Sequence, residues 1–534
     1  MRKSWIAFAA VAAAMLPSCT LLPSAPPAND YIGPAKPSPS QAGQLGEAAA
    51  PAAPPQAAPQ GPLAVSLNEA ILLAMEHNRD LSVRRLDPSI SRTFEQEERA
   101  AFDPDVSIEA SHLRQRAPLT DDTDLRSTDT EISTAVAQHL PTGTDVSVGL
   151  TGSVLTSQLS DDQHTTRIGL SVNQALLRGA GLGVNLAAVG QARIDTLVSE
   201  YELRGFAESL VAQTEQTYWQ YAFAERTIEI VTDALKLAQQ QLDETRERVK
   251  VGTLAETELA APEAEVASRR ENLINARALL GTKRLQLLRL MNPRETDFQD
   301  RQVLLSDAPG APDVNLDDAK VYVEVAMRMR PDLNQARLGV QRGDLELVQT
   351  RNGLLPRLDL FVNLGKSGYA ESFCDSIANI GQERHYDAEV GLVFEFPPAN
   401  RAAKARHERA GYSRDRAMLA VENLAQLVEV DVRIAYGDVN RAREQVTATA
   451  ATRHFKEESL RAETEKFRVG KSTSFLVGQA QRDLLQSQID EVGSLVDFLN
   501  SLANLHLQEG ALLERRGIVA PGATPVDTSA PPRW

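Results

Sequence analysis

The sequence predicts a mainly α-helical protein with a membrane β-barrel, built from a duplicated helix–strands–helix unit. Two very long runs, residues 185–249 and 401–468, carry apolar side chains every three or four positions. A Val-Gly pair and a shorter helical run follow each of them. Segments in which apolar and polar residues alternate strictly precede each of them, as in strands that have one apolar face.

The second long run is the clearest element. Its apolar stripe predicts a helix packed along its whole length against others; the stripe consists of Val421, Leu424, Val428, Val432, Ala435, Val439, Ala442 and Val446. At about 1.5 Å per residue the run is on the order of 100 Å long, too long for a compact domain. Gly470 suits a left-handed helix end, and Ser472 or Ser474 can cap the returning helix. These features predict a hairpin whose tip contains Val469, Gly470, Lys471 and Ser472.

The first long run predicts an equivalent hairpin. Its tip is Val251, Gly252 and Thr253, and Thr253 and Glu256 have capping-box spacing. Pro262 is expected to kink the returning helix. Ser66 and Glu69 have capping-box spacing for one helix that runs to about Ala100, and one corresponding helix is expected to run to about Arg351. The segment that starts at Ser66 resembles the one that starts at Asn315, so we predict one repeat over residues 63–300 and another over 314–516. Chance similarity between helical sequences is the alternative.

The two ends of the chain are predicted to be an export signal with a linker and a disordered tail. Residues 1–18 have the basic start and apolar stretch of a signal peptide. Cys19 then stands where a bacterial lipoprotein carries its lipid, although ordinary cleavage with an incidental cysteine is the alternative. Residues 19–62 are rich in Pro and Ala, which predicts a linker, and residues 517–534 predict a disordered tail.

Six strands are predicted, four before the first long helix and two before the second. The first four lie around residues 106–110, 132–136, 146–151 and 168–173, and the last two are 357–365 and 386–396. Their connections in the first group are expected to be long (116–128), short (141–144) and long (157–165), as in outer-membrane barrels. Six strands cannot close a barrel alone, and unpaired edges in lipid are costly, so several copies must combine.

Composition argues against several other classes of protein. The formal charge is −16 and no basic stripe occurs, which argues against binding to nucleic acid. The histidines lack zinc-ligand spacing, so we expect no metal, no cofactor and no enzyme activity. Gly470-Lys471-Ser472 resembles the end of a phosphate loop, but Glu465 occupies the position of its first glycine.

The chain resembles the TolC-like outer-membrane efflux protein family. The resemblance covers about residues 63–516 and rests on the two repeats, their Asn-Arg-Asp-Leu (78–81) and Arg-Pro-Asp-Leu (330–333) starts, and the two tips. It implies a homotrimer with a β-barrel in outer-membrane lipid and an α-barrel tunnel that extends into the periplasm. It also implies that the tips dock onto a periplasmic adaptor protein and an inner-membrane pump, so that the channel is the exit duct of an efflux or secretion system.

The sequence departs from that family at two points. The family usually has two strands per repeat, so four in the first repeat predict either a trimeric barrel of about 18 strands instead of about 12, or a hairpin (131–154) outside the barrel. The stretch 475–479 of the returning helix also lacks the aspartates with which some members close the tunnel. Charged residues near the tips either form closing ion pairs or are simply solvated; they are Arg248, Lys250, Glu256, Glu258, Arg468 and Lys471. A periplasmic coiled-coil adaptor or structural lipoprotein without a pore is the alternative function.

Overall fold

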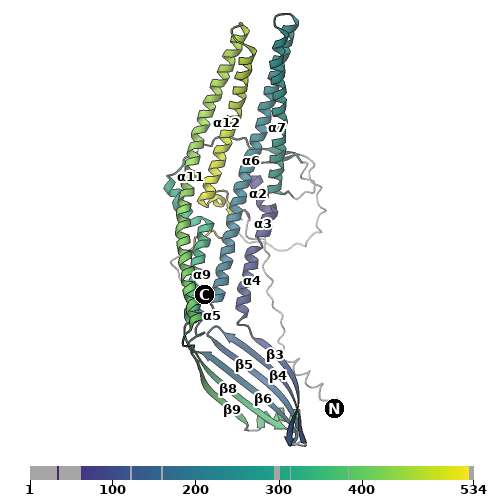
Figure 1. Cartoon of the computed structure of the whole chain (residues 1–534), viewed down its shortest axis with the longest axis vertical. Helices are drawn as coiled ribbons and strands as arrows, with labels where there is room; N and C mark the ends of the chain where they lie inside the picture. The colour runs from purple at the N-terminus through teal and green to yellow at the C-terminus, as the bar shows by residue number, and fades with distance from the viewer. Residues whose placement is uncertain are drawn as a thin grey trace, which may run out of the picture.

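The computed structural model describes residues 33–34, 62–120, 123–157, 160–293, 301–312, 314–382 and 384–527. Long helices occupy one end of an elongated molecule and an antiparallel sheet occupies the other (Figure 1). The predicted lipid attachment site, Cys19, lies outside the described residues. Within them, no helix combines the length and the apolar character that crossing a bilayer requires.

The first half of the chain consists of short helices, four strands and one long helical hairpin. The segment after Ser66 is three helices and not the single helix expected; they are α2 (Leu67–His77), α3 (Arg79–Arg84) and α4 (Asp87–Ala100). The strands are β3 (Asp105–Thr120), β4 (Thr123–Leu140), β5 (Thr144–Ser157) and β6 (Ser160–Ala175). After α5 (Leu182–Asn185), the hairpin consists of α6 (Ala187–Lys250), the short helix η1 (Glu256–Leu259) and α7 (Ala260–Met291).

The second half follows the same order with two strands. It begins with α8 (Ala319–Met329) and α9 (Pro331–Asn352), where one helix was expected. The strands are β8 (Arg357–Ala370) and β9 (Tyr386–Glu395), and α10 (Phe373–Gln382) replaces the predicted loop that carries Cys374. The hairpin is α11 (Arg401–Arg468) and α12 (Ser474–Glu509), followed by α13 (Leu512–Arg515). Two small pairings complete the fold: β2 (Leu63–Val65) with β7 (Val303–Leu305), and β1 (Gly33–Pro34) with β10 (Ile518–Val519).

The six long strands form one sheet in the order β3-β4-β5-β6-β8-β9, and every neighbouring pair is antiparallel. The hairpin at 131–154 is therefore part of the same sheet as the other strands, because β4 pairs with β3 and β5 pairs with β6. The predicted long loops at 116–128 and 157–165 are wrong, because β3 extends to Thr120 and β6 begins at Ser160. The strands continue through polar sequence there, because the backbone hydrogen bonds between neighbouring strands do not depend on apolar side chains.

One face of the sheet is apolar and the other is polar or small. A row of directly paired residues on the apolar face runs across five strands: Val106, Val136, Val148, Leu170 and Leu364. The corresponding row on the other face contains Ser107, Ala135, Gly149, Gly169 and Gly365. Helix α10 packs on the apolar face, where Ser376 is hydrogen-bonded to Thr166 at 2.6 Å.

The two halves meet where the end of α12 and α13 pack against α6. Arg204 of α6 is completely buried, and its Nη2 lies 2.6 Å from Glu514 Oε1. Its Nε lies 3.1 Å from Glu208 Oε1 one helical turn along. Arg516 donates two hydrogen bonds of 2.7 Å to the buried carboxylate of Glu215. These charged groups fix the C-terminal part of the second half onto the first long helix.

Glu208 is expected to make stability depend on pH. Burial raises the pKa of its carboxyl group from 4.5 to about 8, against the opposing effect of the Arg204 charge. A raised pKa means that the folded state binds the proton more tightly, so its contribution is complete below about pH 4.5 and is lost as the pH rises through about 8. We expect the thermal unfolding midpoint to fall over that range and Glu208→Gln to flatten the fall. An equally steep profile in the variant would assign the dependence to other groups.

The described part of the C-terminal segment is packed, although disorder was expected there. Ile518 and Ala520 are buried, and Val526 contacts an apolar cluster between α6 and α9. The Val526 backbone N–H donates to Asn334 Oδ1 at 3.1 Å, and Gln341 Nε2 donates to the Asp527 carbonyl at 3.0 Å. A segment rich in Pro and Ala loses little side-chain entropy on ordering, so a few apolar anchors suffice to hold it.

Candidate functional site: the hairpin tips

Both hairpin tips have the same backbone geometry. Gly252 has a φ of 78° and Gly470 a φ of 75°, the left-handed conformation that glycine adopts at little cost. In the first tip the Thr253 N–H donates to the Arg248 carbonyl at 2.9 Å, and in the second the Lys471 N–H donates to the Lys466 carbonyl at 2.8 Å. This is a Schellman helix end, as the Val-Gly pairs predicted.

The caps of the returning helices differ from the predictions. The Thr253 hydroxyl donates back to the Arg248 carbonyl at 2.8 Å, so the predicted capping box with Glu256 does not form. Pro262 lies in the first turn of α7, a position that tolerates proline, and so does not kink the helix interior. In the second tip Thr473 caps α12, since its side chain accepts from the Leu476 N–H.

Apolar side chains are exposed at both tips. Val251 is 70% exposed and Val469 is 67% exposed, and Phe475 at the start of α12 is 62% exposed. The Ser472 hydroxyl donates to Glu463, which lowers the pKa of that carboxyl group and holds the turn onto α11. Apolar side chains presented on a rigid turn are typical of a surface that binds another protein.

The tip glycines give a direct prediction. We expect Gly470→Ala to destabilise the turn by about 1 kcal/mol, because a side chain at positive φ clashes with the backbone. That raises the population of the opened tip roughly fivefold. Trypsin cleavage after Lys466, Arg468 or Lys471 should accelerate by a similar factor in the folded protein.

Gly437→Ala is the matched control for that prediction. Gly437 lies in the same helix with open space around its Cα, so alanine there should stabilise the helix slightly and leave cleavage at the tip unchanged. Equal cleavage rates for wild type and Gly470→Ala would show that the turn does not depend on the left-handed glycine.

The two hairpins contact each other close to their tips. Arg482 of α12 forms an ion pair of 2.8 Å with Glu265 of α7, whose carboxylate also lies 2.5 Å from Arg269. The Ser474 hydroxyl donates to Glu258 at 3.3 Å, and Arg248 lies over the Phe467 ring at 5.4 Å. Within the single chain, these contacts hold the second hairpin against the first.

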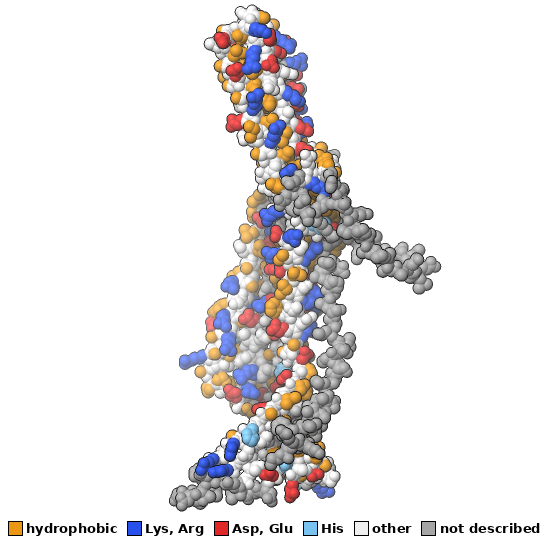
Figure 2. Space-filling view, turned by 90° about the vertical axis from the view of Figure 1, so that its right-hand side faces the viewer, with side chains coloured by type: hydrophobic (Ala, Val, Ile, Leu, Met, Phe, Trp, Pro, Cys, Tyr) orange, Lys and Arg blue, Asp and Glu red, His pale blue; other side chains and the backbone are white. Residues whose placement is uncertain are grey.

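Two of the charged residues proposed from sequence, Arg248 and Glu258, take part in these contacts between the hairpins. Lys250 and Arg468 pair with glutamates of their own helices at 3.6 Å and 3.0 Å. Exposed pairs of this kind contribute little to stability. Sequence reasoning missed Arg482 and Glu265, which are 217 residues apart, because no local pattern relates them. On the face shown in Figure 2, basic and acidic side chains are interspersed along the hairpins.

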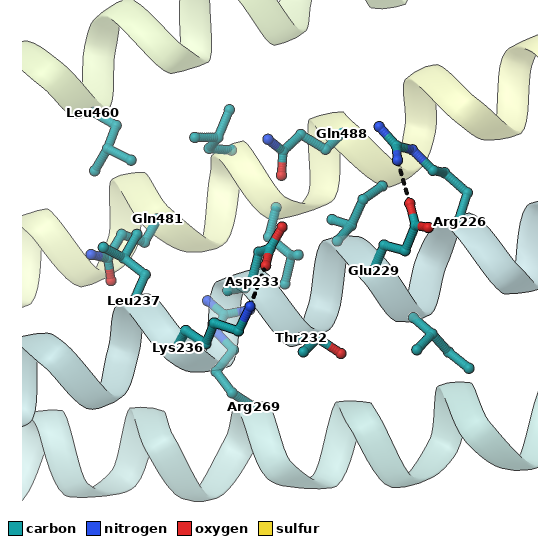
Figure 3. A pocket seen from close by; sticks show the side chains of 15 residues that line it. Arg226, Glu229, Thr232, Asp233, Lys236, Leu237, Arg269, Leu460, Gln481 and Gln488 are labelled. Atoms are coloured by element: carbon teal, nitrogen blue, oxygen red, sulfur yellow. Dashed lines mark hydrogen bonds and ion pairs between the residues drawn. The ribbon is translucent and has the colours of Figure 1, made fainter.

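A groove of about 590 Å³ separates the hairpins below the tips (Figure 3). Asp233 and Lys236 of α6 pair at 3.2 Å on one side, and Gln481 and Gln488 of α12 lie opposite. Its polar and aliphatic lining does not converge on a bound group. Among the described residues, no group of three or more His, Cys, Asp or Glu side chains could hold a metal ion.

Comparison with known structures supports this geometry. The fold is similar to that of the Campylobacter jejuni CmeC outer membrane channel, with 15% identity, a TM-score of 0.63 and 87% of each chain covered. It is also similar to the outer membrane protein VceC from Vibrio cholerae, with 15% identity, a TM-score of 0.61, and 83% of this chain and 96% of that one covered. A third similar structure is the open state of the Neisseria gonorrhoeae MtrE outer membrane channel, with 16% identity, a TM-score of 0.58, and 84% and 89% covered.

The sequence comparisons agree with the fold. No curated protein matches the chain. The sequence model of the outer membrane efflux protein family matches residues 70–293 and 323–510, which include both hairpins, both tips and all six strands of the main sheet. The chain belongs to the outer membrane efflux protein family.

Proposed function

We propose that the protein is the outer-membrane duct of a tripartite efflux or secretion system. Three copies would form a β-barrel in the outer membrane and a helical tunnel that reaches into the periplasm. The single observation that carries the proposal is the two-faced sheet at the base of the long helical hairpins. An apolar row that faces lipid and a polar row that faces a wet lumen are what a membrane barrel requires.

The tips would dock onto a periplasmic adaptor protein that is joined to an inner-membrane pump. Val251 and Val469 present apolar side chains at the ends of rigid turns, and Phe475 extends that surface. Cargo would diffuse outward once the hairpins move apart, with energy supplied by the pump. Lipidation of Cys19 would add an anchor in the outer membrane; a single chain of this kind tethers a protein without spanning the bilayer.

The sheet also argues against the alternative of a pore-free periplasmic adaptor. The six strands of the main sheet are 10 to 18 residues long, and a strand needs about 9–11 residues to cross a bilayer. A water-soluble protein would gain nothing from leaving Val106, Ile108 and Val390 exposed on one face.

Single-channel recording of the full-length protein in a planar bilayer tests the proposal. Discrete pores, together with trimers that resist detergent on a gel, are the expected result. A variant with Gly252→Pro and Gly470→Pro should have altered opening, because proline cannot adopt the positive φ at either tip. Intact oligomers that never conduct, and that fractionate away from the outer membrane, would favour the adaptor alternative.

A further inference from the structure

The hairpin formed by β4 and β5 is long enough to cross the membrane. These strands contain 18 and 14 residues, and β3 and β6 on either side contain 16 each. Crossing a bilayer takes about 9–11 residues of strand. The family that the sequence resembles usually contributes two strands per repeat, which makes four per chain. In this chain β3 and β6 of the first half, together with β8 and β9 of the second, would supply those four without β4 and β5.

The hairpin also carries the lipid-facing pattern in register with its neighbours. Val136 of β4 pairs with Val106 of β3 on one side and with Val148 of β5 on the other, and Val148 pairs with Leu170 of β6. All four side chains are exposed in the single chain. On the opposite face the same strands place Ala135 and other small residues. If this hairpin lay in water, its part of the apolar row would be exposed to solvent, which is unfavourable.

The turn of the hairpin is fixed at the base of the sheet. The Ala175 N–H donates to the Gly143 carbonyl at 2.9 Å, and the Gly181 N–H donates to the Thr142 carbonyl at 3.1 Å. A Cβ on Gly143 would lie 2.2 Å from the Gly179 carbonyl oxygen, so the turn and the glycine-rich loop before α5 are in direct contact. This close fit leaves no room for a side chain at Gly143, and it holds the turn between β4 and β5 against the loop before α5.

The amide side chain of Asn185 completes this attachment. Its Nδ2 donates to the Pro141 carbonyl at 3.1 Å and to the Gly179 carbonyl at 2.9 Å. The turn and the end of α5, which directly precedes the first long helix, are thereby joined by one side chain. The hairpin is therefore attached to the junction between sheet and helices, as β3 and β6 are through the chain itself.

We propose that β4 and β5 are part of the membrane barrel, so that three copies close a barrel of about 18 strands. This inference rests on the proposed function. Strands β3 and β9 are the unpaired edges of the sheet, and five successive antiparallel pairings make them run in opposite directions. The partner for each edge is a second copy of this chain, because exposed Val106 and Phe394 place both edges in lipid, where unpaired backbone groups are too costly.

The extra strands widen the pore at its outer end. Barrel diameter grows roughly linearly with the number of strands, so about 18 strands give a barrel roughly 1.5 times as wide as about 12. The barrel should therefore admit larger solutes from outside than a barrel of about 12 strands would.

Polymer exclusion in planar bilayers tests the width. Poly(ethylene glycol) of graded size is added on the outer side, and the largest size that lowers conductance is measured for the full-length protein and for a variant lacking residues 123–157. We expect the variant to exclude polymers roughly 1.5 times smaller in radius. A variant lacking α10 is the control for deletion itself, because it loses ten residues, and no strand, from the face opposite the lumen, and it should exclude the same polymers as the wild type.

Electron microscopy of the full-length protein in lipid nanodiscs keeps the proposal testable if the shortened chain fails to assemble. About 18 strands around the barrel are expected. A trimeric pore of about 12 strands, with β4 and β5 outside it, would overturn this inference and leave the proposed function intact. A protein with no oligomer and no pore would overturn both.

Discussion

Arg204→Ala is expected to destabilise the protein by about 3–5 kcal/mol, the combined effect of a cavity at a completely buried position and of hydrogen-bonding partners left unpaired. The guanidinium group is completely buried and lies between Glu208 and Glu514, and it also donates to the Gly510 carbonyl at 3.2 Å. Alanine would leave a cavity, an unpaired Glu514 carboxylate and an unsatisfied carbonyl. Thermal unfolding in detergent, followed by far-UV circular dichroism, measures the effect.

Arg226→Ala on the same helix is the matched control. Arg226 also pairs with a glutamate, Glu229, but both side chains are more than half exposed. Its loss should cost at most about 1 kcal/mol. If both variants lowered the unfolding midpoint equally, burial of Arg204 would not be what stabilises the junction of the two halves.

A cross-link between the hairpins is expected to hold the pore at its closed-state conductance. Ser474 Oγ and Glu258 Oε2 lie 3.3 Å apart and belong to different hairpins, so cysteines at both positions lie within reach of a short bis-maleimide whose spacer contains a disulfide. Exposed Cys374 is replaced by serine first, to avoid competing cross-links. Cross-linking should abolish openings in a planar bilayer and reduction of the spacer should restore them, since the hairpins must separate for cargo to pass.

A cysteine pair within one hairpin controls for the chemistry. Arg246 of α6 and Glu263 of α7 form an ion pair of 3.1 Å at a similar level of the first hairpin. Cysteines cross-linked there by the same reagent would join α6 to α7 and leave the second hairpin free, so openings should persist after cross-linking. Undiminished conductance with positions 258 and 474 cross-linked would refute opening by separation of these hairpins.

Local sequence was sufficient to predict the tips and the long helices. Glycine is favoured after the last helical turn because it adopts a left-handed backbone conformation easily, whatever the surrounding sequence. Gly252 and Gly470 both adopt this conformation. Ser66 and Glu69 also form the capping box that their spacing suggests. The breaks within the first helical segment escaped prediction, because the apolar period continues past Asn78, whose side chain caps the next helix at the Leu81 N–H.

The sequence predicted only those parts of the strands in which every second side chain belongs to the apolar face of the sheet. Alternation marks the part of a strand that has one apolar surface, as around Val148 and Leu170. Outside the apolar part of the sheet, Arg116 of β3 pairs with Arg126 of β4. Polar residues lie on both faces there, so the sequence does not alternate and the strand was not predicted. Contacts between distant segments, such as Arg482 with Glu265, leave no local signal, and composition alone misjudged the packed C-terminal segment.

The pairing of β6 with β8 has a consequence for the order of folding. Ser171 and Asn363, which are hydrogen-bonded across these strands, are separated by 192 residues. The meander β3 to β6 can form from local contacts, but the sheet is completed only when the second half of the chain has arrived. Non-local pairing is slow because chain entropy is lost before the contacts form. Until then the apolar face and the edge of β6 are open to aggregation, so the newly exported chain should depend on a periplasmic chaperone during that interval.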